Sequence, residues 1–146
     1  MIRLSWLISL AITFFGFLIV NQLFETEVSG TTGNLGFICM IFLFPFILLS
    51  LFTTFRYFLT VVRIGKNRGK WLVIYGGLLL TAFFLYLFMD MKNSIGASLF
   101  EISEETGQLY FDVYTFGLIH SISGVLGALY GSFNPKTQEI DERPSK

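Results

Sequence analysis

Three ionisable side chains, His120, Asp112 and Arg56, stand within or beside long apolar stretches of this chain. Polar groups inside a membrane are costly and usually face a protein interior or a water path, so each one is a candidate for function. His120 has two interpretations. It is either a neutral imidazole hydrogen-bonded to a neighbouring helix, or a proton relay or substrate contact shared with Asp112.

Small residues share a helical face with this pair. At about 100° per residue, a helix over the fourth apolar stretch places Asp112 and His120 in one sector. The motif GxxxG at 127–131 allows another helix to approach closely, which predicts a packing surface for helix assembly. The small residues of this surface are Ser123, Gly124, Gly127 and Gly131.

Arg56 has two interpretations because the apolar stretch that contains it is longer than one membrane crossing. If the crossing ends at Phe55, Arg56 lies at the interface and meets lipid phosphates. If the crossing continues to Val62, Arg56 shares a face with Thr53 and Thr60 in a buried pairing site.

This chain lacks the residues that several classes of enzyme and cofactor-binding protein require. Cys39 is the only cysteine and His120 the only histidine, so neither a disulfide framework nor a typical zinc site is expected. The chain also lacks HExxH, GxSxG and a Gly-rich phosphate loop. We therefore expect no metal, no cofactor and no enzymatic activity.

The elements that must position these residues are transmembrane helices. Hydrophobic residues make up 53% of the 146 residues and charged residues only 14%, and the mean hydropathy is +0.68. About 20 apolar residues cross a bilayer as a helix. We predict an all-α integral membrane protein, a small bundle within a single domain over 1–133, with Pro45 kinking the second helix. The four predicted spans are 4–24, 36–62, 71–89 and 110–133.

The distribution of basic residues sets the predicted orientation, because Lys and Arg near helix ends stay in the cytoplasm. A basic loop at 63–70 then lies inside with both termini, including a polar tail at 134–146. The loop at 90–109 lies outside, where residues 93–108 form either a surface helix after an Asn93-Ser94 cap or an irregular connection. The residues expected to contact lipid headgroups are Arg63, Lys66, Arg68 and Lys70.

Function is predicted only at the level of class. The formal net charge is zero, so no global field favours nucleic acid. We expect a non-enzymatic multi-pass protein of the cell membrane, an accessory or assembly subunit or a protective factor acting through helix contacts. Its partners would be the lipid bilayer and another membrane protein or a second copy. The alternative is a small carrier or channel that uses Asp112, His120 and Arg56.

Overall fold

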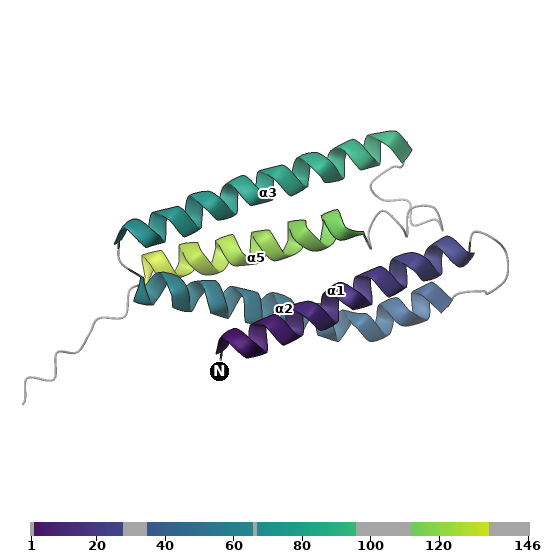
Figure 1. The fold of residues 1–146 in the computed structure, drawn as a ribbon, viewed down its shortest axis with the longest axis horizontal. Helices are drawn as coiled ribbons and strands as arrows, with labels where there is room; N and C mark the ends of the chain where they lie inside the picture. Colours follow the sequence, from purple (N-terminus) through teal and green to yellow (C-terminus); the bar gives the residue numbers. More distant parts are fainter. Residues whose placement is uncertain (1, 28–34, 66, 96–111, 135–146) are drawn as a thin grey trace, which may run out of the picture.

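The computed structural model describes residues 2–27, 35–65, 67–95 and 112–134. In this part of the chain it consists of four α-helices, labelled in Figure 1. Each is long and apolar enough to cross a membrane, and each coincides with one of the segments expected from hydropathy. The helices are α1 (Ile2–Glu27), α2 (Leu35–Ile64), α3 (Asn67–Ile95) and α5 (Val113–Phe133).

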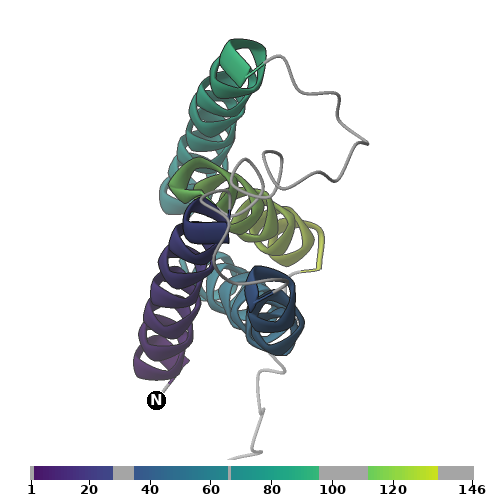
Figure 2. The ribbon, with the colours of Figure 1, turned by 90° about the vertical axis from the view of Figure 1, so that its right-hand side faces the viewer.

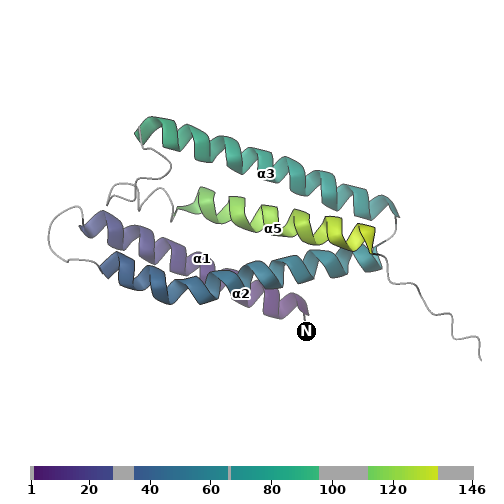
Figure 3. The same ribbon diagram turned by 180° about the vertical axis from the view of Figure 1, so that it is seen from behind.

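The last helix, α5, is the packing centre of the bundle. It lies between α2 and α3 and packs extensively on both, whereas α1 packs mainly on α2 (Figures 1 and 3). Across the bundle the order is therefore α1, α2, α5, α3, which differs from the order along the chain. Figure 2 shows α3 and α1 on the same side, with α5 between them and set back.

Apolar side chains cover the outside of this bundle and polar ones occupy much of its inside. Ile41, Leu72 and Leu79 are among many large hydrophobic residues that are mostly exposed. Thr13, Ser50 and Thr54, in contrast, are buried. A water-soluble domain rarely exposes such a continuous apolar surface. The distribution is the one that a bilayer stabilises, since lipid surrounds the apolar exterior.

Glycines bring α5 into backbone contact with α2. A Cβ atom added at Gly127 would overlap the carbonyl oxygen of Phe55, and one added at Gly131 would lie 2.9 Å from that of Leu59. Both helices thus meet over one turn without intervening side chains. Ser123 strengthens the contact by donating a hydrogen bond of 2.7 Å to the carbonyl of Leu51. The GxxxG face is used inside the chain, against α2.

On its other side α5 meets α3 through interlocking small and large residues. The ring of Phe84 on α3 occupies the space above Gly117 of α5. In the reverse direction, Val125 of α5 reaches into the space above Gly77 of α3, where an added Cβ would lie 2.8 Å from its methyl carbon. Such knob-to-glycine contacts substitute for the hydrophobic effect, which does not drive helix association within lipid.

A row of side-chain hydrogen bonds joins α1 to α2. Ser9 and Thr53 bond through their hydroxyls at 2.7 Å, and Thr13 donates to the carbonyl of Phe46 at 3.2 Å. Pro45 lies one residue before this last acceptor, and α2 bends in its first half as Figure 3 shows. A proline cannot donate to the preceding turn, so a bend is expected there.

Most helix ends differ from the expected bounds, and three of these differences change an expected feature. Helix α3 continues through Asn93 and Ser94 to Ile95, so this pair does not begin a new helix; residues 96–108 of the expected surface helix lie outside the described part. Helix α5 begins at Val113, because Asp112 caps it. The basic loop is shorter than expected, since Arg63 belongs to the last turn of α2 and Lys70 to the first turn of α3.

We predict that Gly127→Ala destabilises the bundle by about 3 kcal/mol, because the new methyl group overlaps the backbone of α2 and forces it away. Thermal unfolding in detergent measures the loss. The matched control is Gly76→Ala on α3, where an added Cβ has no atom within 4 Å. Equal stability of the two variants would contradict the backbone contact.

Candidate functional site

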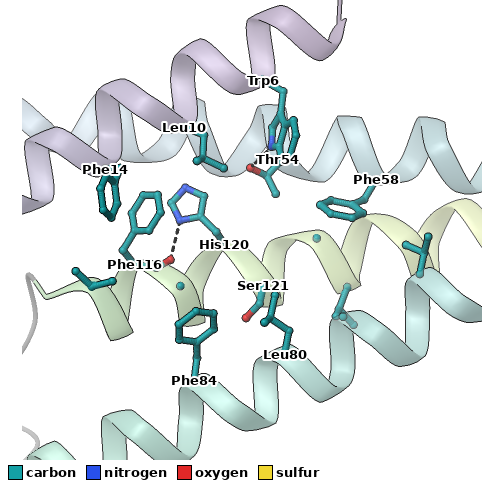
Figure 4. A pocket seen from close by; sticks show the side chains of 16 residues that line it. Trp6, Leu10, Phe14, Thr54, Phe58, Leu80, Phe84, Phe116, His120 and Ser121 are labelled. Carbon is teal, nitrogen blue, oxygen red and sulfur yellow. Dashed lines mark hydrogen bonds between the residues drawn. The ribbon is translucent and has the colours of Figure 1, made fainter.

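An apolar groove of about 440 Å³ is the candidate functional site of the bundle (Figure 4). All four helices contribute side chains to it. Its walls come from α1 and α3 and its floor from α5, while α2 closes it from behind. The side chains labelled in Figure 4 are Trp6, Leu10, Phe14, Thr54, Phe58, Leu80, Phe84, Phe116, His120 and Ser121.

The groove exists because α5 is set back and carries small residues along its floor. Gly117 and Gly124 leave room for two rings, Phe84 from α3 and Phe58 from α2. The nearest ring atom of Phe58 lies 3.0 Å from a Cβ built on Gly124, so the aromatic ring covers the backbone directly. The walls α1 and α3 then stand on either side of α5 without packing extensively on each other.

His120 lies on the floor, with both ring nitrogens engaged inside the protein. Its Nδ1 atom lies 2.8 Å from the carbonyl oxygen of Phe116, one turn earlier, and its Nε2 atom lies 2.9 Å from the hydroxyl of Ser50. A carbonyl can only accept, so Nδ1 carries the proton. In the neutral ring, Nε2 therefore accepts from Ser50. This arrangement matches the first interpretation of His120, as a histidine that joins two helices.

The other polar groups of the groove are satisfied in the same way. The indole N–H of Trp6 donates to Thr54 at 3.0 Å, and the Thr54 hydroxyl donates to the carbonyl of Ser50 at 2.8 Å. Ser121 donates to the carbonyl of Leu118 at 2.9 Å. Every polar side chain lining the groove thus has its donor engaged within the chain. The surface offered to a ligand is that of a hydrocarbon.

Asp112 is not brought into contact with His120. It is the N-cap of α5, where its Oδ1 atom accepts from the backbone N–H of Thr115 at 2.7 Å. His120 is eight residues farther on, about 12 Å along the helix axis. The Oδ2 atom of Asp112 is buried without a hydrogen-bond partner. Burial raises the pKa of this carboxyl above its ordinary value, and the Thr115 hydrogen bond opposes that shift.

The basic candidates lie elsewhere. Arg56 is exposed on α2, with its guanidinium 6.0 Å from the centre of the Phe52 ring, so it does not form the buried pairing site with Thr53 and Thr60. Arg63 and Lys70 are partly exposed, and the Nε atom of Arg63 is buried without a hydrogen-bond partner. Lys66 and the side chain of Arg68 lie outside the described residues.

Sequence reasoning missed the aromatic walls of the groove. A signal was present in their spacing. Trp6, Leu10 and Phe14 follow one another at four-residue steps, and so do Leu80 and Phe84, which places each set on one helical face. What the spacing could not reveal is that these two faces flank the same floor.

Comparison with known proteins does not place the chain in a family. No family model matches the chain, nor does any curated protein or solved structure. Among the described residues, no three His, Cys, Asp or Glu side chains gather closely enough to hold a metal ion.

The raised pKa of Asp112 predicts that the stability of the bundle depends on pH. Because its folded pKa is raised, the stability linked to its protonated form is fully present below the ordinary pKa of 3.8 and is lost as pH rises through the folded pKa. Asp112→Asn keeps an N-cap oxygen but cannot ionise. The unfolding free energy of this variant should therefore decline less with rising pH than that of the wild-type protein. Denaturant unfolding in detergent between pH 3.8 and 7 measures the difference. Parallel declines in both proteins would contradict the assignment.

Proposed function

We propose that this chain is a non-enzymatic multi-pass protein of the cell membrane that holds a hydrophobic partner in the groove between α1 and α3. The groove carries this proposal, because side chains of all four helices line it and its polar side chains have their donors engaged. An accessory, assembly or protective membrane factor needs such a surface. Chemistry on a substrate would need an available nucleophile or base.

The packing of α5 favours the groove, and not the glycine face, as the surface that binds a partner. Gly127 and Gly131 are buried against α2, so a second protein could reach them only by separating the two helices. The groove is accessible without any such rearrangement. A helix contact through the motif is therefore internal, and the surface left for a partner is the groove beside that contact.

Basic residues support an orientation with both termini in the cytoplasm. Arg3, Arg63 and Lys70 lie toward one end of the bundle, where α1 begins and α2 ends (Figure 1). Asp90 and Asp112 lie toward the other end. Positive residues favour the cytoplasmic side, so the first end faces inward. There, Arg63 and Lys70, which are partly exposed, contact lipid phosphates.

Photocrosslinking tests whether the groove holds a partner. Leu80 lines the groove, whereas its neighbour Leu79 is 74% exposed and does not. Each is replaced in turn by the photoreactive residue p-benzoylphenylalanine, and native membranes are irradiated. We expect discrete adducts, identified by mass spectrometry, from position 80 and diffuse labelling from position 79. Indistinguishable adduct patterns would remove the support for a bound partner.

A carrier or channel would give a different result in proteoliposomes. It would move protons or a solute, and His120→Ala would abolish that flux. We expect no flux, because His120 is hydrogen-bonded at both nitrogens and is separated from Asp112 by about two helical turns. A flux that depends on His120 would overturn the proposal in favour of transport.

A further inference from the structure

We infer that the groove binds one acyl chain of a bilayer phospholipid, which lies lengthwise along α5. This inference rests on the proposed function, because it names the hydrophobic partner. Three properties of the groove lead to it: the absence of free donors on its lining, its size and its direction. Each excludes a different occupant.

Water is excluded by the state of the polar groups. A buried water molecule needs two to four hydrogen-bond partners to remain in a cavity. Trp6, Thr54, His120 and Ser121 are the polar side chains of the lining, and each already donates to, or exchanges a hydrogen bond with, another group of the chain. Among the described residues, no charged side chain lines the groove. An uncharged hydrocarbon is the complementary occupant.

The size of the groove excludes a complete transmembrane helix and suits a single chain. A helix with its side chains is about 10 Å wide, far more than this space can enclose. A methylene group takes up about as much room as a liquid water molecule, about 30 Å³. The volume of about 440 Å³ therefore accommodates about 15 methylene groups, which is the scale of one phospholipid acyl chain.

The direction of the groove is that of lipid chains in a bilayer. Its lining on α5 extends from Val113 to Val125 and on α3 from Val73 to Phe84. It thus follows the helix axes over about 18 Å. An acyl chain can enter sideways between α1 and α3 without changing its orientation or exposing its headgroup to the hydrocarbon. A molecule lying across the membrane plane would not fit.

The aromatic lining explains why a chain would stay there. Free lipid chains are as apolar as the groove, so no hydrophobic effect drives the transfer. Retention instead depends on dispersion contacts, which an empty or loosely filled groove forfeits. Rings surround the space on three sides, from Trp6 and Phe14 on α1, Phe84 on α3 and Phe58 on α2. These rigid walls contact a bound chain more closely than mobile neighbouring lipids do.

Site-selective labelling of retained lipid tests the inference. The full chain is reconstituted in phosphatidylcholine vesicles that contain phosphatidylcholine with a diazirine in its 16-carbon chain. The vesicles are dissolved in detergent before irradiation, which dilutes unbound lipid and leaves a retained chain in the groove. Peptide mapping should then show labelling of Leu10 and Leu80 and little labelling of the outward-facing Leu72. Equal labelling of all three residues would overturn the inference.

A blocked variant supplies the second arm. Leu80→Trp fills the groove from α3 and, because overpacking opposes entry, should reduce groove labelling about tenfold. Leu79→Trp adds the same side chain on the outer face and should leave groove labelling unchanged. Equal labelling in both variants would count against an acyl chain. If the native-membrane crosslinks from position 80 are to a protein instead, the proposed function stands and the acyl-chain inference fails.

Discussion

The backbone contact between α5 and α2 is the constraint on which the rest of the structure depends. Gly127 and Gly131 let α5 settle directly against Phe55 and Leu59, which sets the last helix deep in the bundle. Because α5 is recessed, α1 and α3 can stand on either side of it without meeting. The same small residues that bring the two helices together thus leave a groove beside their contact.

Satisfied polar groups give that groove its character. His120 joins α5 to α2 through Ser50, and Trp6 joins α1 to α2 through Thr54. These bonds place polar side chains in the interior while leaving no free donor on the lining of the groove. In a bilayer such a surface favours hydrocarbon over water or a charged solute. The same interhelical hydrogen bonds therefore stabilise the bundle and make the groove selective for hydrocarbon.

Much of the fold follows from sequence, because apolar length alone specifies transmembrane helices and all four helices appear where hydropathy indicates. Helical periodicity also grouped His120 with Gly124 and Gly127 on one face. Periodicity could not show which element packs against that face. Whether the face contacts another protein or α2 depends on tertiary packing. Asp112 illustrates the same limit: shared periodicity suggested joint action with His120, whereas its place as the N-cap separates the two side chains.

The most direct test of the groove as a binding site is the mass of what it retains. Native mass spectrometry of the protein released from phospholipid nanodiscs counts bound lipids on the intact chain. We expect one retained lipid on the wild-type protein and on Leu79→Trp, and none on Leu80→Trp. A folded wild-type protein without lipid, or equal retention by both tryptophan variants, would contradict it.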